Sequence, residues 1–219
     1  MIWTIVVGGG SGRRFGRPKQ YEMLGGERII DRAVRVAASV SDGVVVVVPP
    51  ADAEREGAVA GGATRSDSVR AGLAHVPADC DVICVHDAAR PHASSGLYRA
   101  AIAAIVDDPD VDGAVPGVPI ADTVKVVDDR GAVLSTPDRR SLVAVQTPQA
   151  FRATALREAH ASGSDGTDDA SLVEQCGGRV VVIAGEPLNR KITHAEDLEW
   201  ARLASCEADD RAGRERGTE

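Results

Sequence analysis

The sequence has few aromatic residues, few cysteines and no excess of positive charge. Phe, Trp and Tyr make up only 3% of the 219 residues, whereas 43% of the residues are hydrophobic. A buried core must therefore consist of Val, Ala, Leu and Ile, a composition typical of a parallel sheet covered by helices. The net charge of −8 argues against nucleic-acid binding, which needs basic residues gathered on one face.

The sequence also lacks a long hydrophobic run and a metal-binding cysteine pattern. No stretch has the length of a transmembrane helix, and the N-terminus shows no signal-peptide pattern. We therefore expect a cytoplasmic protein that does not enter a membrane. The four cysteines, at positions 80, 84, 176 and 206, form no C-x-x-C pair, so we expect reduced thiols and no zinc site.

What the sequence does have is a glycine-rich loop directly after an apolar strand. Residues 2–7 (IWTIVV) carry no charge and predict a buried strand that delivers the loop 8–21 (GGGSGRRFGRPKQY) to the edge of a sheet. Glycines allow backbone N–H groups to approach an anion, and Arg14, Arg17 and Lys19 add positive charge. This combination predicts a site for a polyphosphate.

The spacing within this loop excludes two better-known phosphate loops. A dinucleotide-binding fingerprint needs a third small residue where this chain has Arg13 or Phe15. A P-loop needs glycine directly before the lysine, but Pro18 precedes Lys19. A flexible glycine turn is the simplest alternative, and it leaves the sequence PKQY after the glycines unexplained.

Alternating strand and helix patterns predict one α/β domain over residues 1–206. A helical stripe of apolar residues in 29–38 lies between the strand 2–7 and the β-branched run 43–48, and this order implies a right-handed crossover and a parallel sheet. Further strands are expected at 81–87, 113–116 and 179–185. Further helices are expected at 95–106 and 153–160, after 66–67, after 167 and from 194.

Residues 117–145 interrupt this pattern. Two short strands, 122–127 and 132–134, flank the turn 128–131 and predict a hairpin. A hairpin inserted in a parallel domain has little core of its own, so we expect it to protrude and pair with a second subunit, which makes the protein a homodimer. Residues 207–219 are charged without an apolar period and predict a disordered tail.

Polar residues end the predicted strand 81–87, where ligands bind in open α/β sheets. Asp87 can hold Mg²⁺ between its carboxylate and phosphate oxygens. Its alternative role is to cap the segment that follows. We expect Arg90 to meet phosphate and His86 to be a packed histidine.

Two helix starts also carry polar residues. The stretch 61–68 (GGATRSDS) offers glycines and hydroxyls that suit a polar heterocycle, with Ser66 or Asp67 as the helix cap. An ordinary capped helix explains the same residues equally well. Asp168 and Asp169 stand at another helix start, where capping alone could explain the carboxylates and a role in a site explains them equally well.

Eight motifs in order resemble the 2-C-methyl-D-erythritol 4-phosphate cytidylyltransferase family. The first two, Gly-Ser-Gly-x-Arg and Pro-Lys-Gln-Tyr, lie in the loop 8–21 and are similar to the signature of nucleotidyltransferases that activate sugar and polyol phosphates. The others follow in chain order: 61–69 (GGATRSDSV), 85–91 (VHDAARP), 122–125 (DTVK), 146–151 (QTPQAF), 167–171 (TDDAS) and 191–193 (KIT). Together they cover the chain except its tail.

The resemblance implies a fold and a reaction. The fold is a single Rossmann-like nucleotidyltransferase domain, with a mostly parallel sheet flanked by helices and a protruding β-hairpin dimerisation arm inserted at about 117–145. The reaction is the attack of methylerythritol phosphate on the α-phosphorus of CTP, with Mg²⁺, in the non-mevalonate route to isoprenoids. Its products are 4-diphosphocytidyl-2-C-methyl-D-erythritol and pyrophosphate.

The resemblance also implies a role for each matching residue. Arg14 and Lys19 would stabilise the transition state, and Asp87 would hold Mg²⁺. Lys191 would orient the polyol phosphate, which Arg139 would reach from the neighbouring subunit. The implied substrate contacts are Gly8, Gly9, Gly10, Gly12, Gly62, Arg65, Ser68, Ala88, Arg90, Thr147 and Thr167.

The chain departs from the family pattern around the loop. Gly8 and Gly9 stand where the family usually has two alanines, which is expected to loosen the base pocket. The loop is also short, so Arg17 could take part of the role of Arg14. No second domain is present, so we expect no fusion to a later enzyme of the route.

Two alternative functions remain open at this point. A cytidylyltransferase acting on ribitol 5-phosphate shares these motifs, so the sequence does not separate the two substrates. A nucleotide-binding regulatory protein without catalysis would be favoured if Lys19, Asp87 or Lys191 were missing, and all three are present.

Overall fold

The computed structural model describes residues 1–10 and 15–216, with side chains up to Ser205. Its centre is an eight-stranded sheet in the order β10-β7-β11-β6-β1-β4-β5, with β12 paired to β7. β1 pairs in parallel with β4 and β6, β4 with β5, and β7 with β12, whereas β10 and β11 run antiparallel. The strands are β1 (Ile2–Val7), β4 (Gly43–Val48), β5 (Val59–Ala60), β6 (Val82–Asp87), β7 (Gly113–Pro119), β10 (Val143–Val145), β11 (Gln149–Arg152) and β12 (Val180–Ala184).

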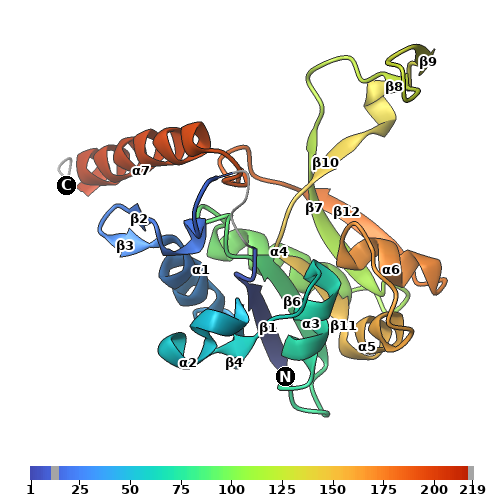
Figure 1. Cartoon of the computed structure of the whole chain (residues 1–219), viewed down its shortest axis with the longest axis horizontal. Helices are drawn as coiled ribbons and strands as arrows, with labels where there is room; N and C mark the ends of the chain where they lie inside the picture. Colours follow the sequence, from blue (N-terminus) through green and yellow to red (C-terminus); the bar gives the residue numbers. More distant parts are fainter. Residues whose placement is uncertain (11–14, 217–219) are drawn as a thin grey trace.

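Helices cover both faces of this sheet, as the aliphatic composition predicts (Figure 1). α1 (Ile29–Ala38) and α4 (Ser95–Val106) pack on one face, and α3 (Arg65–Leu73), α5 (Ala153–Ala161) and α6 (Asp169–Gln175) pack on the other. Each face has its own buried aliphatic cluster, and β-branched strand residues contribute to both. The predicted mostly parallel α/β architecture is confirmed.

The C-terminal helix α7 (Ala195–Arg216) packs beside a small two-stranded sheet of β2 (Met23–Leu24) and β3 (Glu27–Arg28). Figure 1 shows it extending away from the central sheet. The helix includes most of the segment for which the sequence predicts disorder. Ala, Glu and Arg are good helix formers, so the lack of an apolar period there does not prevent a helix. The boundary at residue 206 stays a prediction.

The hairpin forms as expected, with β8 (Val126–Val127) paired to β9 (Val133–Ser135). Asp128 Oδ1 accepts hydrogen bonds from the backbone N–H groups of Arg130 and Ala132, and Gly131 has a φ of +80°, which glycine adopts most readily. The hairpin protrudes beyond the ends of β7 and β10 (Figure 1). Its pairing with a second subunit stays a prediction.

One helix start differs from the sequence expectation. The N-cap of α3 is Thr64, not Ser66 or Asp67. Thr64 Oγ1 accepts from the Asp67 backbone N–H, and the Asp67 carboxylate accepts from the Thr64 N–H, which is a capping box. Because Thr64 and Asp67 satisfy each other, the helix begins at Arg65.

The structure also bears on the cysteines and on the search for a membrane-spanning helix. Cys80 and Cys84 are buried free thiols, and Cys176 is an exposed one. Among the described residues, no helix is both long enough and apolar enough to cross a membrane.

Candidate active site

The first of two adjoining cavities lies at the carboxyl ends of β1, β4 and β6. Its volume is about 620 Å³. This edge is where open α/β sheets bind ligands. The lining residues are Val7, Gly8, Gly9, Gly10, Lys19, Gln20, Pro49, Pro50, Gly62, Ala63, Thr64, Arg65, Ser68, Asp87, Ala88, Ala89 and Lys191. The cavity thus unites the glycine-rich loop with three other predicted motifs.

One wall of this cavity depends on close backbone approach. A Cβ added at Gly62 would lie 2.2 Å from the Cβ of Asp67, so only glycine fits there. Ser68 Oγ accepts from the Gly62 N–H at 3.2 Å and donates to the Thr64 carbonyl at 3.0 Å. A Cβ at Gly9 would lie 3.2 Å from the same Oγ, so the lack of side chains at this wall leaves room for a flat ring.

Asp87, at the end of β6, bonds two cationic side chains of the cavity. Arg65 Nε donates to its Oδ1 at 3.1 Å, and Lys191 Nζ donates to its Oδ2 at 2.6 Å. The Asp87 side chain is 10% exposed. Burial tends to raise the pKa of this carboxyl, but the charges of Arg65 and Lys191 outweigh burial and hold the pKa below its usual value. Asp87 is therefore a fixed negative charge between two cations.

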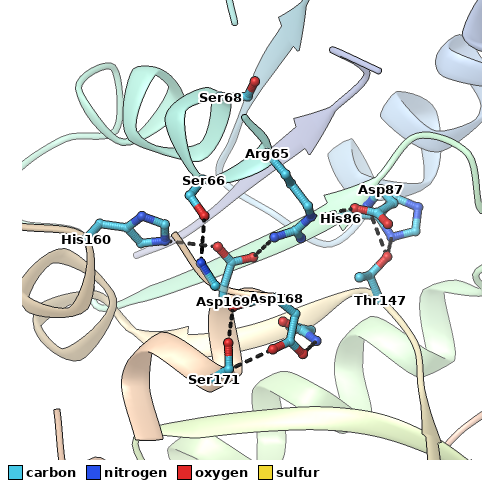
Figure 2. A network of polar contacts seen from close by, with 12 residues as sticks. Arg65, Ser66, Ser68, His86, Asp87, Thr147, His160, Asp168, Asp169 and Ser171 are labelled. Atoms are coloured by element: carbon cyan, nitrogen blue, oxygen red, sulfur yellow. Dashed lines mark hydrogen bonds and ion pairs between the residues drawn. The ribbon is translucent and has the colours of Figure 1, made fainter. Parts of the chain in front are cut away.

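Arg65 is held from its other side by Asp169, a residue whose carboxylate capping alone could have explained at the level of the sequence. Arg65 Nη1 donates to Asp169 Oδ2 at 2.7 Å, and His160 Nε2 lies 2.9 Å from Asp169 Oδ1. Figure 2 shows Arg65 between the two carboxylates, with His160 beyond Asp169. Burial tends to lower the pKa of Arg65, but Asp169 and Asp87 outweigh it and raise the pKa above its ordinary value. Asp168 is the residue that caps α6, because its Oδ1 accepts from the Ser171 N–H.

A second cavity, of about 490 Å³, adjoins the first and shares Arg65, Asp87 and Lys191 with it. The shared residues therefore stand where the two cavities meet. The rest of the second lining comes from the segment before β11, the start of α6 and neighbouring strands: Arg90, Val115, Val145, Gln146, Thr147, Gln149, Thr167, Asp168, Ala170, Ser171 and Glu174.

Arg90 and His86 lie on either side of Asp87 in the chain and have different surroundings. Arg90 lines the second cavity and not the first, and its guanidinium donates to the carbonyls of Asn189 and Val145. Its expected contact with a phosphate stays a prediction. His86 is a packed histidine as expected: its Nδ1 lies 3.1 Å from Thr147 Oγ1, and burial lowers the pKa of His86 to about 4.

Two of the residues considered for the site, Arg139 and Arg17, line neither of the two cavities. Arg139, in a short 3₁₀ helix (Arg139–Ser141) of the arm, donates to the Ala121 carbonyl and lines neither of the two cavities. Arg17 is paired with Glu22 through two hydrogen bonds of 2.5 and 2.9 Å, and its expected share in the role of Arg14 stays a prediction. Gly12 and Arg14 themselves lie outside the described residues.

Among the described residues, no group of three or more His, Cys, Asp or Glu side chains could hold a metal ion by itself. A single carboxylate is compatible with Mg²⁺, which commonly takes one or two carboxylates and completes its shell with phosphate oxygens and water. Asp87 fits that role because its pKa is held low and it borders both cavities. Lys191 is 40% exposed, so it is free to exchange its bond to Asp87 for a phosphate.

The comparisons with known proteins agree with this geometry. The family model of 2-C-methyl-D-erythritol 4-phosphate cytidylyltransferase (IspD) matches residues 2–205. The chain is 45% identical to the protein of that name from Rhodococcus jostii (strain RHA1), over 92% of this chain and 93% of that one. The crystal structure of 4-diphosphocytidyl-2C-methyl-D-erythritol synthase from Anaerococcus prevotii is similar, with a TM-score of 0.82 and 27% identity, covering 93% of this chain and 95% of that one.

Longer relatives match as well. The chain is 43% identical, over 90% of its length, to a bifunctional IspD/IspF enzyme from Nitratidesulfovibrio vulgaris, of which it spans 56%. The chain thus spans about half the length of this and the other bifunctional relatives that it matches.

Proposed function

The chain belongs to the 2-C-methyl-D-erythritol 4-phosphate cytidylyltransferase family, and from this membership we infer that it transfers CMP from CTP to 2-C-methyl-D-erythritol 4-phosphate, giving 4-diphosphocytidyl-2-C-methyl-D-erythritol and pyrophosphate. The observation that carries the inference is the meeting of two cavities at Arg65, Asp87 and Lys191. A reaction between two phosphorylated substrates needs two such sites, with cations where they join.

We assign CTP to the first cavity. The cytosine ring fits the wall of Gly8, Gly9, Gly62 and Ser68, which is formed by backbone groups and one hydroxyl, with Ala88 alongside. The triphosphate then extends along the backbone of Gly10 toward Lys19, and the predicted contacts of Gly12 and Arg14 belong to the same loop. Polyol phosphate fills the second cavity, beside Thr147 and Thr167.

The chemistry is an in-line attack of the acceptor phosphate on the α-phosphorus. Negative charge increases on that phosphorus and on the leaving pyrophosphate, so catalysis rests on cations and positioning. Lys19 and Arg14 supply charge on the triphosphate side. Lys191 holds the attacking phosphate, and Asp87 orients Lys191 and Arg65 through the two bonds described above.

We propose Mg²⁺ as the cofactor, held by Asp87 together with phosphate oxygens. When bound, it would neutralise charge on the triphosphate.

We further propose a homodimer formed through the arm, with Arg139 serving the neighbouring site. Val126, Val127, Val133, Leu134, Val143 and Val145 are each 39–66% exposed on or beside the arm, an apolar surface that a second subunit would cover.

The decisive experiment measures pyrophosphate release with CTP and Mg²⁺, offering methylerythritol 4-phosphate or ribitol 5-phosphate. Lys19→Ala should lower kcat by about 10²- to 10³-fold, because it removes a cation from the triphosphate site. Arg17→Ala is the matched control: it removes one positive charge from the same segment, but from a side chain that is 65% exposed and paired with Glu22.

The outcomes separate the candidates. Turnover with methylerythritol phosphate that collapses only in Lys19→Ala supports the proposal. Turnover with ribitol phosphate alone would show that ribitol phosphate is the acceptor substrate. If neither compound gives pyrophosphate release, only nucleotide binding without catalysis remains.

A further inference from the structure

Two groups of polar side chains line the second cavity. The first is cationic and surrounds Asp87, with Arg65, Arg90 and Lys191. The second is a hydrogen-bonded group at the start of α6, in which Gln149 contacts Asp168 and Asp168 contacts Ser171. A phosphate oxygen can only accept hydrogen bonds from these groups, so the cationic group is the place for a phosphate. The second group, which includes a carboxylate and an amide oxygen, suits a ligand group that donates hydrogen bonds.

Gln149 is the unusual member of that second group. It is the first residue of β11, its backbone pairs with Val85 in β6, and its side chain is 1% exposed. Its Nε2 donates to Asp168 Oδ2 at 2.7 Å. Because a carboxylate accepts and does not donate, this bond fixes which end of the amide faces Asp168. Among the described residues, nothing donates to the buried Oε1 of Gln149.

A buried amide oxygen without a donor is costly in a folded protein, so a donor from outside the chain would be favourable at this position. Gln146 provides the contrast within the same segment. Its Oε1 accepts from the Glu186 N–H and from Asn189 Nδ2, and its Nε2 donates to the Glu186 carbonyl. Both glutamines are buried and line the second cavity. Of these two glutamines, Gln149 is the one whose side-chain oxygen accepts no hydrogen bond from the described residues.

We propose that Gln149 is a specificity-determining residue for the acceptor substrate, and that its Oε1 accepts a hydrogen bond from a hydroxyl of the polyol phosphate. This inference rests on the proposed function, which supplies a substrate with both a phosphate and hydroxyl groups. The phosphate lies against Arg65, Arg90 and Lys191, and the hydroxyl-bearing carbons extend toward Gln149 and Asp168. The site therefore selects a phosphorylated polyol over a simple alkyl phosphate.

The test compares wild type and Gln149→Met with methylerythritol 4-phosphate and with analogues that each lack one hydroxyl. In wild type, the analogue lacking the recognised hydroxyl should lose about 10- to 100-fold in kcat/KM, because Oε1 is then left unpaired. Gln149→Met should lose a similar factor with the full substrate, mainly through KM. It should show no further loss with that one analogue, and its KM for CTP should change less than about twofold.

Gln146→Met is the matched control. It also replaces a buried glutamine of the same cavity, but one whose hydrogen bonds all go to the protein. It should lower the melting temperature and affect every analogue by the same factor. If Gln149→Met does not fold, Gln149→Asn, which shortens the amide and withdraws Oε1, should give the same selective loss.

Two results would overturn the inference: a kcat/KM for Gln149→Met within about threefold of wild type, or an equal loss with every analogue in both proteins. Failure of the proposed function is distinguishable, because it is decided by wild type alone. If the wild type turns over no polyol phosphate, both the proposed function and the proposed role of Gln149 are wrong. If the wild type turns over a polyol phosphate, the proposed function stands, and the Gln149 variants test the role of Gln149.

Discussion

At the residue scale, the site is built on one guanidinium held between two carboxylates. Arg65 bonds Asp87 on the cavity side and Asp169 on the core side, where Asp169 is fully buried and further contacted by His160. A buried ion pair contributes little net stability, but losing one partner leaves a buried charge uncompensated. This arrangement therefore fixes the position of Arg65, and Asp87 keeps Lys191 beside it until a phosphate takes over the Lys191 bond. The cations are placed before any substrate arrives.

The buried His86 next to this group makes stability depend on pH. Burial lowers the pKa of His86 to about 4, although the nearby Asp87 charge partly offsets burial. The unfolded chain takes up this proton near pH 6.5, so the folded state loses stability as pH falls from about 6.5 to about 4. The loss should reach about 3 kcal/mol in the free energy of unfolding. Urea denaturation with chelator present, repeated across that range, measures it.

His86→Asn is the control for this pH dependence. Asparagine can keep the hydrogen bond to Thr147 Oγ1 but does not titrate. The slope of stability against pH should therefore be shallower in the variant. Burial also lowers the pKa of His92, so part of the slope remains in both proteins. Equal slopes in the two proteins would show that His86 is not the group responsible.

At the scale of elements, α3 matters because its start forms one wall of the CTP cavity. Its capping box joins Thr64 and Asp67, and the helix carries Arg65 and Ser68 into the site. Local hydrogen bonds, not core packing, thus fix where the cavity wall begins. The glycines just before the cap allow the wall to approach a ligand closely.

Removing the cap should destabilise the protein measurably. Thr64→Ala loses the bond from the Asp67 N–H and should lower the free energy of unfolding by about 1 kcal/mol. Thr64→Ser keeps a hydroxyl at the same position and should lose much less. Denaturant titration of both variants provides the measurement. A loss of equal size in the two would mean that packing of the methyl group, and not capping, is what Thr64 contributes.

At the scale of the whole molecule, the arm carries an assigned site residue, Arg139, that lines neither cavity of its own chain. Arg139 belongs to the arm, which protrudes from the domain and carries exposed apolar strands (Figure 1). In a two-fold dimer each arm can reach the other subunit, because the same surface is used twice. The site of one chain would then be completed by its partner.

Subunit mixing tests this arrangement. Arg139→Ala and Lys191→Ala should each be nearly inactive alone. In a mixed dimer, one site takes Lys191 from the first variant and Arg139 from the second, so co-refolding equal amounts should restore roughly a quarter of wild-type activity. If Arg139 serves its own chain, no mixed dimer contains an intact site, and activity does not return. Light scattering during the assay checks that dimers are present.

The sequence by itself determined the fold class and the most local parts of the site. Alternating apolar periods predicted the helices 29–38 and 95–106 and the strand 43–48, because each element buries one side or both. Gly62, Lys19 and Asp87 stand in short motifs that carry their own chemistry, whereas Lys191 was assigned from the family resemblance alone. The resemblance then supplied an order for these motifs, which the two cavities bring together.

Only the tertiary structure decided which side chains meet. Asp169 and His160 support Arg65 from α6 and α5, and Gln149 faces the second cavity from β11, although nothing near them in the sequence indicates it. A local sequence pattern depends only on residues that are near one another in the chain. It therefore offered capping as an explanation for Asp169 and gave Gln149 no role. Contacts such as Arg65 to Asp169 join residues about a hundred positions apart. Their formation depends on how the helices pack on the sheet, and packing is a property of the whole chain.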